Sequence, residues 1–461
     1  MDKDQLGKHF AADLAKEDIS ILKPLVSTGR NFFIVVFILV GIILFGVMAW
    51  LLQLRRGLGL TGLNQPVFWG IYITNFVFFI GISHAGTLIS AILRLARAEW
   101  RRAITRSAEV ITVLVLFFGV FNILLDLGRP DRMLKVFSSG KLASPLLWDV
   151  MSISVYMAAS AVYLYLPLIP DIALMRDKMK GRARGFFYKI LALNWNNTEK
   201  QWHTLEKAIS IMAVAVIPIA VSVHTVVSYV FAMTIQPMWH STIFGPYFVT
   251  GAIFSGIAAL IIAMYLIRRS YHLEAFLKPV HFNNLGLLLL VMSLLWFYFT
   301  FTENLTAFYG ADPAHLKVFW AKFTGSYAPY FWTMILFCFV IPLAVLANKK
   351  TRTVTGTMIA SVFVIIGMWL ERFTIVLPTL INPRLPYPQG VYHPSWIEFA
   401  VTAACFATFI LLYILFTKFF PIISIWEIKE GKERGIKETE ERIKSYLPEL
   451  EAGASRPATN L

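Results

Sequence analysis

The chain has 461 residues, of which 57% are hydrophobic and only 15% charged, and its formal net charge is +15. With a mean hydropathy of +0.65, this composition excludes an ordinary soluble globular protein. The only two cysteines are Cys338 and Cys405, both in apolar segments. They exclude a disulfide framework, and they are too few to hold an iron–sulfur cluster, which needs about four thiolates. We interpret both as small buried packing residues.

Apolar segments of about 20 residues, the length that crosses ~30 Å of hydrocarbon, recur along the whole chain. We therefore predict an all-α integral membrane protein with ten transmembrane helices. The predicted spans are residues 32–54, 66–93, 104–127, 147–167, 204–233, 244–267, 281–303, 328–347, 354–377 and 396–416. The first span lacks a small-residue cleavage site, so we expect it to be retained rather than removed as a signal peptide.

The positive charge has a clear distribution across the predicted loops. Both tails and alternate loops hold 30 Lys and Arg residues, whereas the five loops on the other side hold 9. Because basic residues accumulate on the cytoplasmic side, this asymmetry places both termini in the cytoplasm. Membrane orientation alone therefore explains the positive net charge, and we expect no nucleic-acid partner.

The two predicted cytoplasmic tails differ in character. Residues 1–31 form a charged N-terminal tail, followed by the first span and its outer loop over residues 32–65. The C-terminal tail covers residues 417–461, and its segment 427–452 alternates acidic and basic residues. That pattern is typical of a solvent-exposed helix.

Two segments of the chain share a pattern that indicates an internal repeat. The tetrapeptide LKVF occurs at residues 134–137 and again at 316–319, each time followed by Gly, Ala, Pro and Trp before the next span. We predict two four-helix bundles, residues 66–233 and 244–377, in the same orientation as a parallel repeat, with the first and last spans outside them. His84 of the first copy aligns with Ala258 of the second, so we expect the chemistry in the first copy.

Three charged residues lie near the outer face of the first bundle. Ionisable groups at membrane depth are costly, and each is a functional candidate. Asp126 ends the third span, Arg129 follows about one helical turn later and is expected to pair with it, and Asp149 begins the fourth span. Together they could line a pocket reached from the lipid. The alternative is an interfacial ion pair that only caps the helices.

Two histidines lie deeper in the first bundle. From the predicted span ends, His84 and His224 differ in depth by about 14 Å at ~1.5 Å per residue, which excludes them as axial ligands of one haem. His84 is a candidate proton relay because its ordinary pKa is near neutral, or else a hydrogen-bonded core residue. His224 and nearby Tyr229 are candidates for a proton pathway.

The second bundle carries Glu303 at the outer end of one span and Glu371 and Arg372 within another. Adjacent helical residues face different directions, so we predict that Glu371 and Arg372 do not pair with each other. A structural ion pair with other partners and a second proton pathway both remain open. The outer loops 234–248 and 382–396 are rich in aromatic residues and proline, which suits either a docked partner or an interfacial aromatic belt.

Several motifs together resemble a known family. They are NFVFFIGISHAGTLISAILRL (75–95), LLDLGRPDRM (124–133), HTVVSYVFAM (224–233), ERFTIVLP (371–378) and PRLPYP (383–388). The sequence resembles the NrfD/PsrC family of polysulfide reductase membrane subunits across nearly all its spans. Within the family it is most similar to the ten-span ActC subunit of alternative complex III.

The resemblance implies a quinone-reactive membrane subunit of a bacterial respiratory complex in the cytoplasmic membrane. Such a subunit exchanges electrons between a quinol, with menaquinol expected, and a ferredoxin-like iron–sulfur subunit on the outer face. Further membrane subunits, and haem c or molybdopterin subunits, would complete the complex. The chain itself is expected to ligate no metal, haem or iron–sulfur cluster and to show no catalysis when isolated. The resemblance leaves proton translocation open.

The resemblance also suggests roles for individual residues. Asp126 is the expected proton acceptor, tuned by Arg129, with Asp149 and His84 as quinone hydrogen-bonding or relay groups. Near the start of the second span, Asn64 is retained as a quinone contact, whereas Phe68 stands where shorter family members carry His. Phe68 and Trp69 are expected to pack on the quinone ring.

Three other functions stay open from the sequence. The chain could serve a molybdopterin oxidoreductase of the polysulfide reductase type, or act as a membrane anchor with no quinone site. A secondary transporter would also show repeats and buried charges, but it usually has Gly or Pro interruptions in matching spans, and Pro218 alone does not supply that pair.

Overall fold

The computed structural model describes residues 21–22, 24–25, 28–178 and 183–446. Within these ranges every regular element is a helix, and ten helices are long and apolar enough to cross a membrane. The ten spans are α3 (Arg30–Arg56), α4–η2–α5 (Ile71–Leu95), α6 (Thr105–Asp126), α8 (Pro145–Lys178), α10 (Glu199–Ala232), α11 (Phe244–Tyr271), α12 (Pro279–Gly310), α14–η5–α15 (Ala328–Leu346), α16 (Val354–Ile381) and α17 (Trp396–Phe419). The predicted all-α membrane architecture is confirmed. Most of the predicted N-terminal tail, and residues 447–461 of the C-terminal tail, lie outside the described residues.

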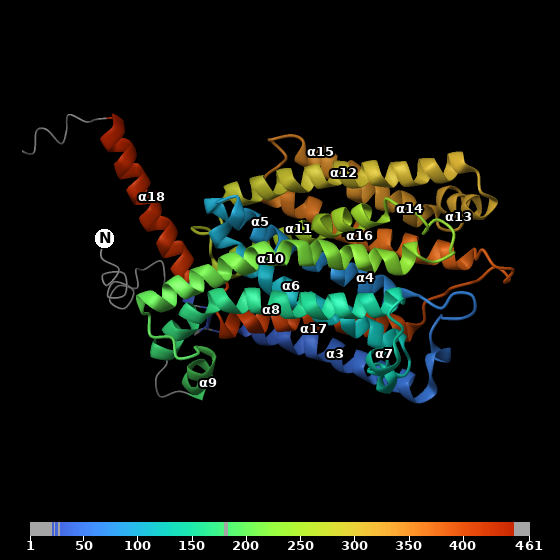
Figure 1. Ribbon diagram of the computed structural model, residues 1–461, viewed down its shortest axis with the longest axis horizontal. Helices are drawn as coiled ribbons and strands as arrows, with labels where there is room; N and C mark the ends of the chain where they lie inside the picture. Colours follow the sequence, from blue (N-terminus) through green and yellow to red (C-terminus); the bar gives the residue numbers. More distant parts are fainter. Residues whose placement is uncertain (1–20, 23, 26–27, 179–182, 447–461) are drawn as a thin grey trace, which may run out of the picture.

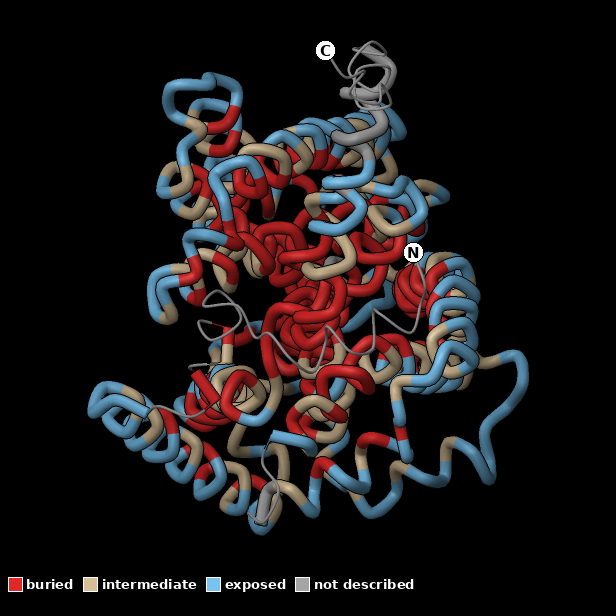
Figure 2. The backbone as a smooth tube through the Cα atoms, turned by 90° about the vertical axis from the view of Figure 1, so that its left-hand side faces the viewer, coloured by how far each residue is buried: buried red, intermediate tan, exposed pale blue. Residues whose placement is uncertain are grey.

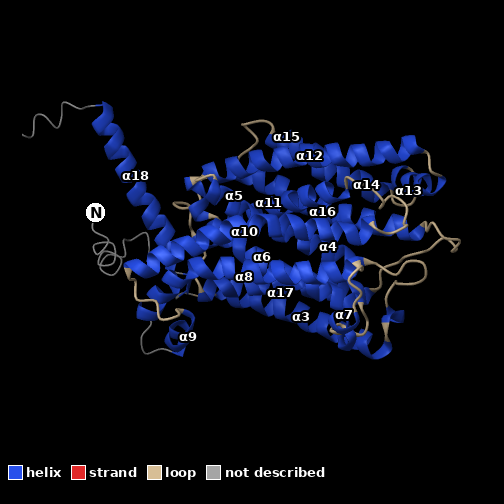
Figure 3. Cartoon of the chain, viewed as in Figure 1, coloured by secondary structure: helices blue, strands red, loops and turns tan. Residues whose placement is uncertain are grey.

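The spans lie side by side along the long axis of the molecule (Figures 1 and 3). At one end lie α18 (Ile425–Tyr446) and the short helix α9 (Ala183–Leu191). At the other end lie the short helices α7 (Lys135–Ser139) and α13 (Pro313–Phe323). We call these ends the α18 side and the α13 side.

The spans pack in two groups of four that meet in the middle. In the first group α6 packs against both α4 and α8, and α8 packs against α10. In the second group α11 and α16 pack on each other and α12 joins them, while α14 and α15 pack along α16. The groups meet where α11 contacts α4 and α10, and α3 and α17 form a pair beside the first group. The predicted duplication itself stays a prediction, although each LKVF segment lies in or next to a short helix, α7 or α13, before the next span.

Helix α4 (Ile71–His84) is the centre of this arrangement. All of its residues are buried, which is typical of a helix enclosed by other helices on every side, and Figure 2 shows buried backbone concentrated in the interior. It continues into one π-helical turn, η2 (Ala85–Ile89), before α5 (Ser90–Leu95). At Gly86 an added Cβ would lie 1.9 Å from the Ala108 carbonyl oxygen of α6. Only glycine therefore permits this approach of the two helices.

Helix α8 extends further than predicted. The hydropathy pattern predicts an end near residue 167, but the helix continues through Pro167 and Pro170 to Lys178. Proline inside a helix removes a backbone hydrogen bond. The extension brings Asp171 into the buried part of the α18 side, where it is 0% exposed.

The contact between α3 and α17 gives a stability test with an internal control. At Gly46 an added Cβ would lie 2.2 Å from Cβ of Ala404, whereas at Gly41 of the same helix nothing lies within 4 Å. We expect Gly46→Ala to cost about 1–3 kcal/mol through overpacking, and Gly41→Ala to be neutral or to stabilise by up to ~1 kcal/mol through helix propensity. Thermal unfolding of the purified chain in detergent measures both, and equal shifts would contradict the packing argument.

Candidate functional site

The two candidate aspartates of the first bundle both lie on the α13 side. Asp126 ends α6, and Asp149 lies near the start of α8, after its first turn, where it is 3% exposed. Within the described part of the chain, the Oδ1 atom of each is buried without a hydrogen-bond partner. A buried acceptor without a partner is costly. Both carboxyl groups therefore retain an unused position for a proton or for a donor from a ligand.

Arg129 does not pair with Asp126, so that prediction is wrong. Its Nη2 lies 3.0 Å from Oδ2 of Asp131, and the two side chains are 62% and 59% exposed. The physical reason is that α6 ends at Asp126 and the chain turns at Gly128, whose φ is +63°. The helical spacing that would bring the two residues together no longer applies.

Other polar groups lie next to Asp126. The Tyr72 hydroxyl of α4 donates to Oε1 of Gln53 over 2.6 Å, and Nε2 of Gln53 donates to the Leu125 carbonyl over 3.1 Å. Glu398 of α17 is fully buried and lies within electrostatic range of Asp126. None of these groups is among the residues predicted from the sequence, although Glu398 is an ionisable residue inside the predicted span 396–416.

Glu398 itself has a structural explanation. Its carboxylate accepts hydrogen bonds from the Tyr392 hydroxyl at 2.6 Å, from Gly62 N at 2.7 Å and from Ser395 N at 2.9 Å. The Tyr392 oxygen in turn accepts from Ile71 N, at the start of α4. Because these bonds join two loops to a helix terminus, Glu398 anchors the loops above the first bundle.

The three expected quinone contacts near the start of the second span have different surroundings. Asn64 donates both amide hydrogens to backbone carbonyls, at 2.9 Å to Gly62 and 2.6 Å to Val391, which leaves only its oxygen for a ligand. Trp69 packs within the protein, 5.8 Å from the Trp239 ring. Phe68 is 49% exposed.

His84 and His224 are in direct contact, so the predicted separation in depth is wrong. Their ring centroids lie 3.8 Å apart. The Nε2 atom of His84 lies 2.7 Å from the Ala220 carbonyl and must donate to it. The depth estimate failed because α4 begins at Ile71, later than predicted, and the helix ends are not level with each other. Because the two rings touch, they cannot bind opposite faces of one porphyrin as axial ligands.

Glu371 and Arg372 do pair with each other, contrary to the prediction. The Oε2 and Nη1 atoms lie 2.7 Å apart, and each side chain is 1% exposed. Their Cβ atoms diverge along α16, but both side chains are long enough to turn towards each other. Their charged atoms are not aligned for a hydrogen bond, so charge alone holds the pair. The guanidinium also lies 4.9 Å from the Phe248 ring centroid, a favourable cation–π distance.

The ion pair and the histidines belong to one buried region. Arg372 lies within electrostatic range of His224, and an added Cβ on Gly251 of α11 would lie 2.8 Å from its Nη2 atom. The region lies where α4, α10, α11 and α16 meet. Buried ionised groups at membrane depth are rare and costly, which makes this junction a functional candidate.

Glu303 faces a small cavity on the α13 side of the second group. Its Oε2 accepts a hydrogen bond from Oγ of Ser241 over 2.7 Å. Tyr247 and Lys322 line the same cavity, whose volume is about 30 Å³, enough for about one or two water molecules. Burial lowers the pKa of Lys322 to about 8, against the opposing effects of Glu303 and Glu371. Sequence reasoning missed Lys322 because it lies in α13, outside the spans.

Tyr229, the remaining pathway candidate, is 37% exposed on the surface of α10. It is not brought together with the buried pair of histidines.

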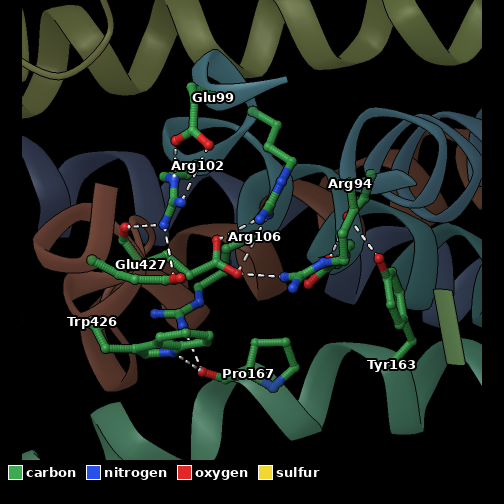
Figure 4. A network of polar contacts seen from close by, with 12 residues as sticks. Arg94, Glu99, Arg102, Arg106, Tyr163, Pro167, Trp426 and Glu427 are labelled. Carbon is green, nitrogen blue, oxygen red and sulfur yellow. Dashed lines mark hydrogen bonds and ion pairs between the residues drawn. The ribbon is translucent and has the colours of Figure 1, made fainter. Parts of the chain in front are cut away.

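The α18 side holds an ion network that the sequence did not predict (Figure 4). Glu427, in the first turn of α18, is 1% exposed and forms ion pairs with Arg94 and, at 3.4 Å, with Arg101. Arg102 donates to the Glu427 carbonyl over 2.7 Å and to Oε2 of Glu430 over 2.9 Å. The predicted solvent-exposed helix is therefore wrong for its first turn, which the arginines hold against the membrane bundle.

A second part of the network binds the extension of α8. Arg106 donates to Asp171 over 2.5 Å and to the Pro167 carbonyl over 2.9 Å, and this carbonyl also accepts from Nε1 of Trp426. Figure 4 shows Arg106 and Trp426 beside Pro167. The arginines here are matched by carboxylates and carbonyls, which indicates a structural role.

Glu109 lies deeper than this network and was also missed. It is 3% exposed, and it accepts a hydrogen bond from Ser90 over 2.7 Å, while Ser90 lies 3.3 Å from the Tyr163 hydroxyl. The rule that selected Asp126 applies equally to Glu109, because it falls inside the predicted span 104–127.

The docking of α18 depends on the charge of Glu427. Burial alone would raise its pKa, but the guanidinium groups of Arg94, Arg101 and Arg106 outweigh burial and hold the pKa below its ordinary value. A carboxylate with a lowered pKa stabilises the folded state above its ordinary pKa and loses that contribution as the pH falls through the lowered value. Docking should therefore be complete above pH 4.5, the ordinary value, and weaken below it.

We expect Glu427→Gln to accelerate limited proteolysis within α18 about tenfold at neutral pH, because hydrogen bonds to a charged group contribute about 1.5–3 kcal/mol. Glu433→Gln, at an exposed position of the same helix, is the control and should leave the rate unchanged. If the two variants are cleaved at the same rate, Glu427 does not hold the helix.

The described part of the chain has no group of three or more His, Cys, Asp or Glu side chains that could hold a metal ion. Comparison with known proteins finds a match to the family model described as "Polysulphide reductase, NrfD" over residues 59–383. A protein of Halobacterium salinarum, named as a membrane subunit of a dimethyl sulfoxide reductase, is 25% identical over 439 residues, covering 89% of this chain and 96% of that protein.

Two further relatives cover most of the chain. The "Hdr-like menaquinol oxidoreductase integral membrane subunit" of Archaeoglobus fulgidus is 23% identical over 87% of this chain and 96% of its own. A protein of Mesobacillus selenatarsenatis, named as a subunit of selenate reductase, is 23% identical over 82% of this chain and 92% of its own. The names of all three describe subunits of oxidoreductases.

Proposed function

The chain belongs to the NrfD family of polysulphide reductase membrane subunits, and from that premise we propose that it is the quinone-reactive subunit of a multisubunit oxidoreductase. It exchanges electrons between a quinol, with menaquinol the expected one, and an iron–sulfur subunit. The name of the Archaeoglobus relative, a menaquinol oxidoreductase subunit, supports the choice of quinol.

The observation that carries the proposal is the pair of buried, unpartnered carboxyl oxygens of Asp126 and Asp149 within the described chain. Oxidation of a quinol to a quinone releases two protons and two electrons. A carboxylate held away from bulk water is a suitable general base for a hydroxyl proton. In this proposal Asp126 accepts the proton of one quinol hydroxyl, and Asp149 hydrogen-bonds the second hydroxyl and accepts its proton, while the two electrons pass to the iron–sulfur partner.

The distribution of basic residues supports an orientation for this chemistry. Among the described residues, the loops and the start of the C-terminal tail that belong to the basic set lie on the α18 side, which the positive-inside rule places in the cytoplasm. The α13 side, with Asp126 and Asp149, then faces outward. There the loop 382–396 exposes Leu385, Tyr387 and Val391, and an apolar surface of this kind suits a docked partner subunit.

The deeper groups have a separate role in the proposal. His84 and His224 contact each other, and His224 also lies within electrostatic range of Arg372. The two histidines are therefore suited to hold or move protons between the two bundles. Glu303 and Lys322 form the outward continuation of this region in the second bundle. Translocation of protons across the membrane through these groups would extend the proposal. Arg129 has no part in it because its side chain is exposed.

The identity of the whole complex is a choice between two forms. The motifs similar to the ActC subunit favour a quinol-oxidising complex of the alternative complex III type, in which haem c subunits take part. The reductase names of two relatives favour a complex with a molybdopterin reductase subunit instead. Purification of the native complex and identification of its partner subunits by mass spectrometry decides between them. Family membership argues against the transporter alternative.

Removing the proposed proton acceptor gives the direct test. We expect Asp126→Asn to lower quinol turnover of the native complex about a hundredfold, the usual scale for loss of a general base, with normal assembly. Turnover is measured in native membranes with a soluble menaquinol analogue, and assembly by native electrophoresis.

Asp131→Asn is the matched control, because Asp131 lies a short way further along the chain, is exposed and pairs with Arg129. It should keep full turnover, as should Arg129→Gln. If Asp126→Asn abolishes assembly of the complex instead, Asp126 is a structural residue and the proposed acceptor is wrong.

A further inference from the structure

Helix α9 (Ala183–Leu191) turns an apolar face away from the bundle. It lies beside the α18-side end of the spans (Figure 1). Phe186 and Ile190, four residues apart and therefore on one face of the helix, are 71% and 59% exposed. Tyr188, and Ala192 directly after the helix, are 0% exposed and lie on the face that packs against the bundle. A contiguous apolar face on the outside of a protein marks an interaction surface.

Two hydrogen bonds fix the depth of α9 relative to the spans. The Tyr188 hydroxyl donates to the carbonyl of Phe419, the last residue of α17, over 2.7 Å. The Tyr165 hydroxyl of α8 donates to the Leu191 carbonyl over 2.5 Å, and Tyr165 falls inside the apolar span predicted for residues 147–167. Helix α9 therefore lies level with the ends of two apolar spans, whereas α18 extends away from the bundle (Figure 1).

Aromatic contacts fix the rotation of α9 about its own axis. The Phe187 ring lies 6.4 Å from the rings of Phe419 and Phe420, measured between centroids. Rings at this distance are in favourable contact. Together with the buried Tyr188, they hold the opposite face of the helix towards the surroundings of the bundle.

The sequence around this apolar face is basic. Residues 176–189 contain six Lys or Arg and one acidic residue, Asp177, which pairs with Arg176 at 3.0 Å. Lys178 and Lys189 are exposed. Lys189 is three residues from Phe186 along the helix, so it lies at the border of the apolar face. A lysine there can lay its apolar stem along the membrane and reach the headgroups with its ammonium group.

This combination fits a lipid surface better than a protein partner. The centre of a protein–protein interface is depleted of charged residues, and lysine is depleted there in particular. A helix that lies in the membrane interface has Phe or Leu on one face and Lys or Arg beside it. Basic segments directly next to a spanning helix on the cytoplasmic side attract anionic lipids.

We propose that α9 is an interfacial helix that inserts Phe186 and Ile190 into the leaflet on the α18 side, and that Lys189 binds the phosphate of an anionic phospholipid there. The site lies at the end of the bundle opposite Asp126 and Asp149. It goes beyond the proposed function and does not depend on it.

Fluorescence quenching in lipid nanodiscs tests the insertion. Both natural cysteines are buried, so the cysteine of Ile190→Cys can be labelled selectively with a nitrobenzoxadiazole fluorophore in the full chain. A phospholipid with a nitroxide near the top of its acyl chain should quench this label about twofold, because interfacial helices bury their apolar face ~5–10 Å into the boundary of headgroups and acyl chains. Glu433→Cys, at an exposed position of α18, is the control and should not be quenched.

The choice of lipid is tested in the same labelled chain. Nitroxide-carrying phosphatidylglycerol should quench the label at position 190 more strongly than nitroxide-carrying phosphatidylcholine at the same mole fraction. Lys189→Gln should lower this preference about fivefold, the scale of one basic residue at an anionic membrane surface. Lys437→Gln is the matched control, because it makes the same change of charge at an exposed position of α18, and it should leave the preference unchanged.

Three results would overturn the proposal. If position 190 is quenched no more than position 433, α9 does not insert. Equal quenching by the two lipids, or a preference that survives Lys189→Gln, removes the phosphate site at Lys189. Finally, quenching that is present in the isolated chain and lost in the complete native complex would mean that a partner subunit covers α9.

Discussion

The rest of the structure depends on the close packing of helix α4 in the middle of the molecule. A helix buried on every side contributes no surface to lipid, so its neighbours must supply all of its contacts, and Gly86 allows α6 to approach its continuation to backbone distance. This packing sets the position of His84, which donates to a carbonyl of α10 and contacts His224 there. Helix packing therefore determines the junction of the two bundles, and it fixes the positions of the polar groups there.

The two ends of the bundle differ in whether their buried charged groups have partners. On the α18 side the arginines are matched by Glu427, Asp171 and backbone carbonyls, so burial is compensated and the network joins α18 to the bundle. On the α13 side Asp126 and Asp149 each keep an oxygen without a partner in the described chain. Compensated ion pairs are expected of structural contacts, since breaking a buried pair costs several kcal/mol, whereas uncompensated carboxyl groups are retained where something binds. The contrast separates the two kinds of site by their hydrogen bonding and not by residue type.

The sequence is sufficient for the architecture because membrane insertion acts on hydropathy averaged over about 20 residues, and that average survives small errors at helix ends. It is insufficient for side-chain partners. Helical spacing predicts that Asp126 pairs with Arg129, and fails because the helix ends at Asp126 and the chain turns at Gly128. Cβ directions predict that Glu371 and Arg372 stay apart, and fail because long side chains can turn back on each other. Contact between His84 and His224 depends on the relative heights of two helices, which no single-helix pattern contains.

The two bundles have similar helix arrangements but different polar residues. If they arose by duplication, the copy with His84 has the two aspartates that each keep one oxygen without a partner in the described chain, while the copy with Ala258 has Glu303 and Lys322 around a small cavity. An intact polar junction runs between the copies through His224 and Arg372. A buried ionised pair at that junction is costly in hydrocarbon, and packing alone gives no reason to keep it. Proton exchange with ligands in both bundles would account for the pair. Because the charges of Glu371 and Arg372 are compensated mainly by each other, their electrostatic energy changes when a group in either bundle gains or loses a proton.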